Sequence, residues 1–347
     1  KKTMKRVCII GHFGHGENLL NGQTVKTKIV TKEIVKELGK KEVSCIDTHG
    51  GVKALISAFR HALIALKYHK NIIIMPAENG LRIFAPLLVL LNLLFHRKLH
   101  YVVIGGWLPE FLKKRKKLTK ALMSFDGIYV ETNTMRKALE AQGFNDVYVM
   151  PNFKDLNILK ESELVYHHTE PYRLCTFSRV MKEKGIEDAV NAVKTVNEHF
   201  GRIVYTLDIY GQVDSAQTEW FNELKSTFPL YIKYGEFVPF DKSVEVLKNY
   251  FALLFPTYYE GEGFAGTLLD AMAAGVPVIA SDWRYNPEIV NEKTGYVYPV
   301  HDNHAFVTTL ISVGNNSDLL LSKKSDCLKE AEKYRAENVI QCLTSKL

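Results

Sequence analysis

The sequence has little cysteine, and its cysteines follow no recognisable spacing. The five cysteines are an odd number, and none stands in a Cys-x-x-Cys pair. Three of them, Cys8, Cys45 and Cys175, lie in apolar segments typical of strands, where a free thiol acts as a small hydrophobic side chain. This pattern excludes a disulfide framework and a cysteine zinc site, and it predicts a reducing, cytoplasmic compartment.

Long hydrophobic runs are also missing. The longest, 83–95, has about 13 residues and is interrupted by Pro86 and Asn92, whereas a spanning helix needs about 20. We expect a buried core helix or an interfacial segment there, and no membrane crossing. The basic start and short apolar run of 1–11 lack the features of a signal peptide, so we expect none.

Charge is unevenly divided along a chain of otherwise average composition. The 347 residues are 46% hydrophobic and 24% charged, with a net charge of +7, as in a globular protein of about two domains. Residues 1–165 hold 27 Lys and Arg against 14 Asp and Glu, whereas 166–347 hold 18 against 24. We therefore expect the basic half to face an anionic partner.

Short apolar runs alternate with helical patterns in both halves. Strands are expected at 6–11, 43–47, 71–75, 99–105, 127–131, 147–150, 173–178, 203–210, 230–234, 252–255, 276–280 and 295–298. Uninterrupted apolar strands alternating with helices predict an α/β fold of two doubly wound, Rossmann-like parallel-sheet domains. The pattern lapses over 151–171, so we place the domains at 1–165 and 166–347, with a ligand cleft between their strand ends. The closing pattern over 318–343 is expected to be helical, and its last helix to pack back on the first domain.

The segment 255–282 combines a strand end, a glycine-broken loop and the start of a helix. The first N–H groups of this helix, from Ala265, Gly266 and Thr267, can bind a phosphate. Glu262 and Asp270 would repel a phosphate but suit hydroxyl groups, so the segment favours a nucleotide sugar. The alternative is that the two acids only charge the start of the helix.

A second informative segment, 177–186, places cations before another helix. Arg179 offers a planar fork and Lys184 a point charge, and together they can hold a diphosphate. The alternative here is a solvated charged turn.

The two segments resemble the donor site of the retaining GT-B glycosyltransferases, a family 4-like group that includes bacterial polysaccharide and capsule enzymes. That family has two acids separated by seven residues before an Ala-Met-Ala-x-Gly-x-Pro run, matched here by Glu262, Asp270 and 271–277. The resemblance implies that Glu262 contacts the donor sugar and Asp270 the ribose. It also implies that Arg179 and Lys184 are catalytic with Glu262, because they stabilise the departing diphosphate. The second acid of the family is usually Glu, whereas this chain has Asp270.

The resemblance extends to further donor contacts. It implies donor-binding roles for Gly14, Gly16, Phe237, Gly263, Phe264, Ala265, Gly266 and Thr267. Glycines in the loop at 11–16 allow close approach of a ligand, but their spacing is not Gly-x-Gly-x-x-Gly, which disfavours a dinucleotide oxidoreductase. Phe237 stands where the family binds the base, with core packing as the alternative. His12 and His15 stay open as sugar or phosphate ligands, and Trp107 follows two glycines where the family often has a histidine.

A cationic run follows Trp107: Lys113, Lys114, Arg115, Lys116 and Lys117. Leu108, Phe111, Leu112, Leu118, Ala121 and Leu122 can share the opposite face of one helix. Such a basic amphipathic helix predicts a surface that binds the acceptor or a membrane, and this membrane would be an anionic bilayer. A solvated helix face is the alternative. A nucleic-acid partner is not expected, because no base-reading motif accompanies the run.

The resemblance, together with these observations, implies a retaining hexosyltransferase that needs neither metal nor cofactor. It would move a hexose from a nucleoside-diphosphate sugar, with UDP favoured by the resemblance, to a lipid-linked saccharide acceptor in cell-surface polysaccharide synthesis. It would work in the cytoplasm, peripheral at the inner membrane face. A nucleotide-sugar epimerase of the same fold and a non-catalytic membrane scaffold are the alternatives, and the sugar, the base and the acceptor stay open.

Overall fold

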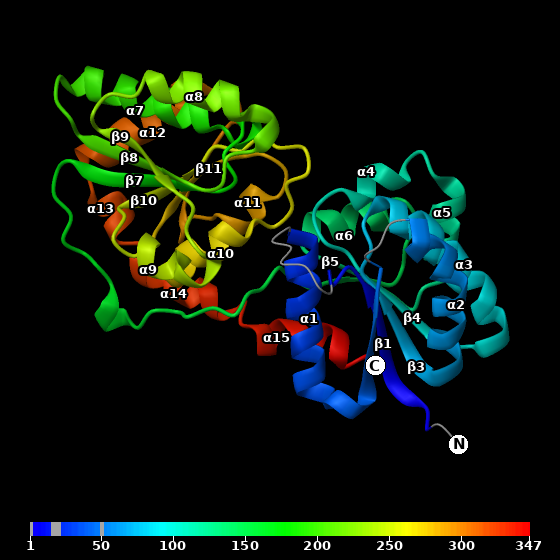
Figure 1. Cartoon of the computed structure of the whole chain (residues 1–347). Helices are drawn as coiled ribbons and strands as arrows, with labels where there is room; N and C mark the ends of the chain where they lie inside the picture. The colour runs from blue at the N-terminus through cyan, green and yellow to red at the C-terminus, as the bar shows by residue number, and fades with distance from the viewer. Residues whose placement is uncertain (1–2, 15–21, 49–51) are drawn as a thin grey trace. The chain divides into compact units, whose positions relative to one another are not determined.

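The computed structural model describes residues 3–14, 22–48 and 52–347, with side chains given outside 52–56. The chain divides into two compact units. Unit 1 comprises Lys1–Asp155 and Ala336–Leu347, and unit 2 comprises Leu156–Arg335. Figure 1 shows one sheet in each unit, with helices on both of its faces.

Unit 1 contains a six-stranded parallel sheet in the order β2-β1-β3-β4-β5-β6. Its strands are β1 (Lys5–Gly11), β2 (Val43–Asp47), β3 (His69–Ile74), β4 (Lys98–Val102), β5 (Gly127–Val130) and β6 (Val147–Val149). Its helices are α1 (Gly22–Leu38), α2 (Val52–Tyr68), α3 (Glu78–Phe95), α4 (Leu108–Leu112), α5 (Lys116–Leu122), α6 (Asn133–Glu140) and α15 (Ala336–Thr344). Every pair of neighbouring strands is parallel, so each connection must return the chain across the sheet, and helices serve that purpose.

One core of unit 1 lies between the sheet and the helices α1 and α15. Val30 and Ile34 of α1 pack in the same cluster as Val7 and Ile9 of β1. Ile340 of α15 is fully buried in it, so the last helix of the chain is part of this domain's core. Helices α2 and α3 contact each other on the other side of the sheet (Figure 1).

Unit 2 repeats the architecture with the strand order β12-β11-β10-β7-β8-β9. Its strands are β7 (Tyr172–Phe177), β8 (Tyr205–Tyr210), β9 (Ile232–Glu236), β10 (Ala252–Phe255), β11 (Val278–Ser281) and β12 (Gly295–Tyr298). Its helices are α7 (Ile186–Phe200), α8 (Thr218–Ser226), α9 (Ser243–Leu247), α10 (Gly266–Ala273), α11 (Asn286–Ile289), α12 (Asn303–Asn315), α13 (Asp318–Leu321) and α14 (Lys324–Glu332). Helices α7 and α12 pack together over one large apolar cluster, whereas α10 contacts α9 and α14. The predicted fold class of two doubly wound parallel sheets is confirmed.

The boundary between the units differs from the one placed at 165/166. Residues 156–165 belong to unit 2 because the backbone N–H of Leu159 donates to the carbonyl of Ala273 at 2.9 Å. Glu161 accepts a hydrogen bond from Ser325 at 2.8 Å in the same unit. The residues 318–343, predicted to be helical, form the three helices α13, α14 and α15. The last of them, α15, belongs to unit 1.

The prediction of a single basic helix after Trp107 is wrong. The structure has two short helices, α4 and α5, separated by residues 113–115, with Arg115 outside the helical region at φ −129° and ψ 61°. The Arg115 side chain donates to the carbonyl of Phe111 at 2.8 Å, which satisfies a carbonyl at the end of α4. Leucines spaced four apart in each helix, Leu108 with Leu112 and Leu118 with Leu122, are buried in unit 1. The apolar face predicted to meet a membrane therefore lies in the domain interior.

Candidate active site

Two loops that follow neighbouring strands form the candidate site in unit 2. Strands β7 and β10 pair in parallel, so the segments after their carboxyl ends, 178–186 and 256–266, emerge side by side. The backbone N–H of Tyr258 donates to the carbonyl of Glu183 at 2.8 Å and ties the two loops together. Gly185, at φ +70°, makes this approach possible, because a Cβ there would lie 2.0 Å from the carbonyl oxygen of Pro256.

This approach brings two predicted site residues into direct contact. The Nζ of Lys184 lies 3.0 Å and 2.7 Å from the two carboxylate oxygens of Glu262, and both side chains are largely buried. The hydroxyl of Thr257, fully buried, donates to the same carboxylate at 2.7 Å. Since a carboxylate has about four acceptor positions, these three bonds leave room for one more donor, such as a sugar hydroxyl.

The start of α10 has the properties expected of an anion site. Its first N–H groups have no acceptor within the helix, and the N-cap residue Ala265 supplies no side-chain cap. The hydroxyl of Thr267 is buried without a hydrogen-bond partner among the described residues. A polar ligand at this helix start would satisfy these groups, and the helix dipole would favour a negative one.

The remaining predicted residues of this loop differ in exposure. Asp270 is buried one turn into α10, whereas Gly263 is half-buried. Phe264 is buried and packs edge-on against Tyr334, with ring centroids 5.1 Å apart, so its ring stabilises the loop.

Arg179 is more loosely held than Lys184. Its side chain is about half exposed, lies 3.5 Å from the carboxylate of Asp214 and contacts the sulfur of Met181 at 3.3 Å. An exposed ion pair of this kind contributes about 0–1 kcal/mol, so little energy opposes a move of the guanidinium to a bound diphosphate.

Phe237 follows β9 and is 55% exposed, so core packing, the alternative interpretation of this residue, is wrong. Nearby, Gly211 has φ +137°, and a Cβ there would lie 1.8 Å from the carbonyl oxygen of Ser178. The close approach of these two backbones keeps the loop after β8 against the loop that carries Arg179.

In unit 1, the predicted glycine loop is described only in part. Gly14 is buried at φ +62°, whereas His15 and Gly16 lie outside the described residues. The ring of His12 lies 2.7 Å from the hydroxyl of Thr24. Trp107 is half-buried, and its indole N–H donates to the carbonyl of Ile104 at 2.8 Å.

Sequence reasoning missed two features of the candidate sites. Thr257 was not singled out, although it stands between the strand end and the acidic loop. Lys26 in α1 is buried, donates to Asn152 at 2.8 Å and lies over the ring of Phe153 at 4.0 Å. Burial lowers the pKa of Lys26 to about 8, and the charge of Glu131 opposes this effect. A lysine in a helical pattern gives no sequence signal of burial, because the neighbours that enclose it are distant in the chain.

The five cations of the predicted surface border the gap between α3 and α5. Lys113, Lys114, Lys116 and Lys117 are exposed, and Lys113 pairs with Glu110 at 2.5 Å. The guanidinium of Arg115 lies over the ring of Phe111 at 3.8 Å.

Comparison with known proteins finds a family match over the part of the chain that contains this site. Residues 171–316 match the family described as glycosyl transferases group 1, and this range contains Arg179, Lys184, Glu262 and Asp270. The GtfA subunit of the UDP-N-acetylglucosamine–peptide N-acetylglucosaminyltransferase of Streptococcus gordonii is 28% identical over 209 residues, which are 54% of this chain and 38% of that protein. The poly(ribitol-phosphate) alpha-N-acetylglucosaminyltransferase of Staphylococcus aureus (strain COL) is 21% identical over 241 residues, 67% of this chain and 45% of that protein. The chain thus spans less than half the length of these two curated relatives.

The fold is shared with solved structures along the whole chain. The structure of Anabaena Alr3699/HepE in complex with UDP has a TM-score of 0.74 at 12% identity, with 98% of this chain and 99% of that chain covered. At this identity the likeness concerns the fold alone, which is the GT-B fold predicted from the sequence. Residues 171–316, less than half of this chain, thus match the glycosyl transferases group 1 family.

Proposed function

We propose that the chain transfers a hexose from a UDP-sugar to a saccharide acceptor with retention of configuration at the sugar. The observation that carries this proposal is the buried contact of Lys184 with Glu262, next to the uncapped start of α10, in a glycosyl transferases group 1 domain. A cation and a helix start suit a diphosphate, and the carboxylate suits the hydroxyl groups of a sugar.

UDP is the preferred nucleotide in this proposal. The name of the S. gordonii relative specifies UDP-N-acetylglucosamine, and the Anabaena structure contains UDP. N-acetylglucosamine is therefore the first donor sugar to test.

The proposed reaction needs no covalent intermediate with the protein. As the bond between the sugar and the diphosphate breaks, Arg179 and Lys184 neutralise the charge that develops on the leaving group. The acceptor hydroxyl attacks from the face that the diphosphate leaves and passes its proton to the departing diphosphate oxygen, which gives retention. Glu262 holds the sugar in position, and its bonds to Lys184 and Thr257 fix its own orientation. We propose that the reaction requires no metal, so that it proceeds in EDTA.

The acceptor we propose is a lipid-linked saccharide, used in the synthesis of a cell-surface polysaccharide. The names of the two relatives give a peptide and poly(ribitol phosphate) as acceptors, so the family tolerates different acceptors. The basic character of unit 1 supports an acceptor that carries phosphate. We place the reaction in the cytoplasm, at the inner membrane face, and the five unpaired cysteines are consistent with a reducing compartment.

The test measures transfer from a panel of nucleotide sugars by wild type and by the Arg179→Ala and Glu262→Ala variants. We expect turnover of a UDP-sugar to fall by about a hundredfold or more in each variant, because each loses an electrostatic or positioning contact. Lys225→Ala, a change of an exposed cation in the same unit, serves as the control.

Glu262→Ala leaves Lys184 buried without its partner, so the thermal stability of this variant must be measured together with its transfer activity. Near-normal transfer in either site variant would overturn the site assignment. Conversion of the donor sugar without any acceptor would favour an epimerase, and tight UDP-sugar binding without turnover would favour a scaffold.

A further inference from the structure

Helix α3 presents apolar side chains to solvent in unit 1. The 18 residues Glu78–Phe95 form a helix long and apolar enough to cross a membrane, yet only 22% of them are buried. Leu81, Phe84, Ala85 and Leu88 are buried against the domain, whereas Leu90, Leu93 and Leu94 are 65%, 68% and 79% exposed. We name these three residues the leucine stripe.

The fold determines how this helix can meet a bilayer. Helix α3 connects β3 to β4, which are neighbouring parallel strands of one sheet. It must therefore return the chain across that sheet and cannot leave it to span a membrane. Its exposed half can only lie along a surface. Phe59 of α2, the helix that contacts α3, is also exposed.

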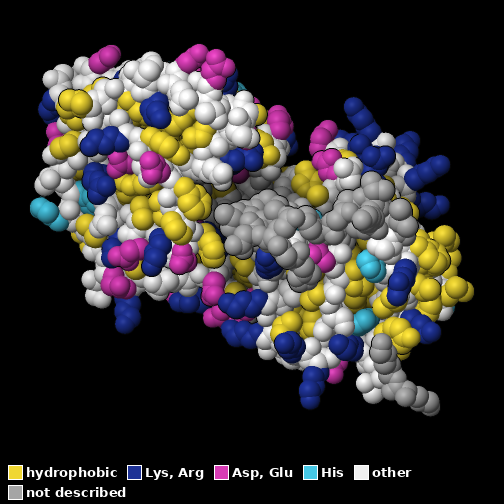
Figure 2. All heavy atoms as spheres, viewed as in Figure 1, with side chains coloured by type: hydrophobic (Ala, Val, Ile, Leu, Met, Phe, Trp, Pro, Cys, Tyr) yellow, Lys and Arg dark blue, Asp and Glu magenta, His cyan; other side chains and the backbone are white. Residues whose placement is uncertain are grey.

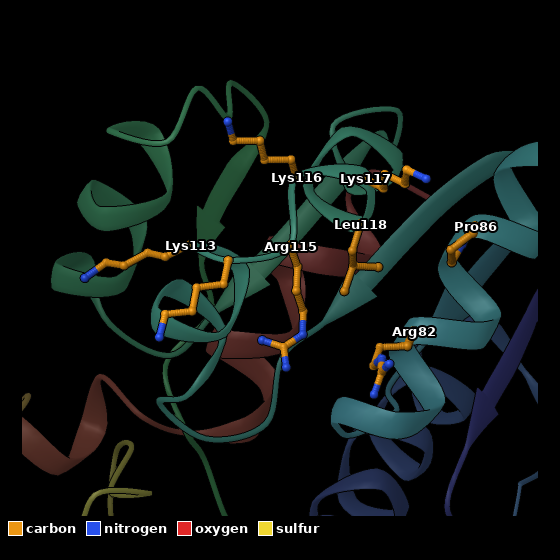
Figure 3. A pocket seen from close by; sticks show the side chains of 8 residues that line it. Arg82, Pro86, Lys113, Arg115, Lys116, Lys117 and Leu118 are labelled. Atoms are coloured by element: carbon orange, nitrogen blue, oxygen red, sulfur yellow. The ribbon is translucent and has the colours of Figure 1, made fainter.

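A cationic pocket continues the stripe toward the start of the helix. A cavity of about 670 Å³ is lined by Arg82, Pro86, Lys113, Lys114, Arg115, Lys116, Lys117 and Leu118. Figure 3 shows Arg82 and Pro86 on α3 facing Arg115 and Leu118 across it. Arg82, Pro86, Leu90 and Leu94 recur every four residues, so the pocket and the stripe lie along one side of α3.

The same arrangement appears on the surface of the domain. Figure 2 shows hydrophobic side chains gathered over the α2–α3 side of unit 1 and Lys and Arg side chains projecting over α4 and α5. Lys98 stands exposed just beyond the other end of α3, so cations flank the leucine stripe at both ends.

We propose that unit 1 binds an anionic phospholipid bilayer through α3, with the leucine stripe among the acyl chains and a lipid phosphate in the cationic pocket. An interfacial helix buries its apolar face about 5–10 Å into the bilayer and holds its cations at the level of the head groups. Arg82 and the cations of 113–117 beside the start of α3, together with Lys98 beyond its end, supply those cations, and the leucine stripe supplies the apolar face. This surface keeps the five cations 113–117 predicted from the sequence, but its apolar part is α3 and not the buried leucines of α4 and α5, and it does not depend on sugar transfer.

Charge complementarity favours a bilayer over a second copy of the chain. In a twofold dimer that pairs the two leucine stripes, the cations that flank each stripe at both ends would lie against cations of the partner. Lysines are also depleted in the cores of protein interfaces, whereas an anionic bilayer supplies a negative charge for each of them.

The experiment measures sedimentation of the full chain with vesicles of phosphatidylcholine alone or with 30% phosphatidylglycerol. We expect binding to the anionic vesicles only, weakened in high salt. The variant L93Q/L94Q should reduce the partition coefficient by about tenfold or more, because two side chains lose their apolar burial. Its matched control, I203Q/L230Q, changes two exposed apolar residues of unit 2 and should bind as wild type.

The cationic part is tested by R82Q/K114Q/K117Q, which spares Arg115 because that side chain contacts Phe111. We expect a reduction of about tenfold or more. The control K28Q/K40Q/K41Q removes the same charge from exposed positions on α1 and the following 3₁₀ turn, and should bind nearly as wild type.

The proposal would be overturned if L93Q/L94Q bound anionic vesicles as strongly as wild type. It would also be overturned if R82Q/K114Q/K117Q and its control K28Q/K40Q/K41Q reduced binding equally. A dimer that the leucine changes dissociate, without vesicle binding by the wild type, would assign the surface to a protein partner instead. Binding of inorganic phosphate, with no difference between wild type and L93Q/L94Q on vesicles, would reduce the site to a free-phosphate site.

Discussion

Gly185 joins the loop that carries Lys184 to the start of α7, with φ at +70°. A methyl group there would meet the carbonyl oxygen of Pro256 at 2.0 Å, and backbone atoms cannot yield as a flexible side chain would. The contact between Lys184 and Glu262 therefore depends on a residue that has no side chain.

We predict that Gly185→Ala destabilises unit 2 by about 2–5 kcal/mol, the sum of left-handed strain and overpacking. It should also abolish UDP-sugar turnover, because the loop carrying Lys184 must shift. Gly201→Ala is the control, since Gly201 has φ +62° but a Cβ there meets nothing within 4 Å. It should cost only about 1–2 kcal/mol. Chemical denaturation measures both, and equal losses would refute the role of Pro256.

Lys324 in α14, like Lys26 in α1, has a buried environment that disfavours its charged form. Its side chain is fully buried, and its Nζ has no hydrogen-bond partner among the described residues. Desolvation lowers the pKa of Lys324 to about 8, and the nearby Cys327 opposes this effect.

We predict that Lys324→Met stabilises the protein by about 1–3 kcal/mol at pH 7, because the burial of an ammonium group is no longer required. Between pH 8 and 10.5 the unfolded wild type binds more protons than the folded form, so wild-type stability rises with pH. The advantage of the variant should shrink over that window. Urea melts at pH 7 and pH 10 measure this, with the exposed Lys329→Met as the control. A variant less stable than wild type at pH 7 would contradict the argument.

At the scale of elements, α15 is the clearest case of a helix whose place is decided by distant residues. It follows α14 after a short connection, yet it packs into the core of unit 1 beside α1. Ala336, Val339, Ile340 and Leu343 are its buried residues in that cluster, spaced three and four apart as in an amphipathic helix.

We predict that Ile340→Ala lowers the stability of unit 1 by about 2–5 kcal/mol through the cavity it leaves. Gln341→Ala, the next and exposed position on the same helix, should change stability by less than about 0.5 kcal/mol. Hydrogen exchange can localise the effect, and we expect faster exchange in β1 and α1 but not in β7 or α7. Equal acceleration in both units would contradict the assignment of α15 to unit 1.

At the scale of the whole molecule, the two units have separate cores and opposite charge. Unit 1 carries 27 basic and 13 acidic side chains, whereas unit 2 carries 18 and 25. The predicted cations and acids of the donor site, Arg179, Lys184, Glu262 and Asp270, all belong to unit 2.

We predict that thermal unfolding shows two transitions and that UDP raises mainly the one belonging to unit 2. At a concentration one hundred times the dissociation constant, UDP should stabilise that unit by about 2.7 kcal/mol, which is several degrees. Differential scanning calorimetry with and without UDP measures this, and Arg179→Ala should reduce the shift. An equal shift of both transitions would show that the nucleotide contacts both units equally or that they unfold together.

The sequence by itself determined the fold class and the approximate places of the strands, and its motifs carry the resemblance to a glycosyltransferase family. Apolar runs such as 71–75 are local patterns, and short-range sterics and hydrophobicity are sufficient to interpret them. Arg179, Lys184, Glu262 and Asp270 were singled out by their residue types and spacing, and their chemical roles, which the resemblance implies, stay predictions.

Only the tertiary structure decided which groups meet and which apolar faces are covered. Lys184 and Glu262 are 78 residues apart and pair because β7 and β10 are neighbours in the sheet, which no local pattern specifies. The leucines of α4 and α5 and those of α3 look alike in sequence, yet the former are buried and the latter exposed. The physical reason is that a side chain's hydrophobicity is a property of the residue, whereas its burial depends on the elements that the fold places against it.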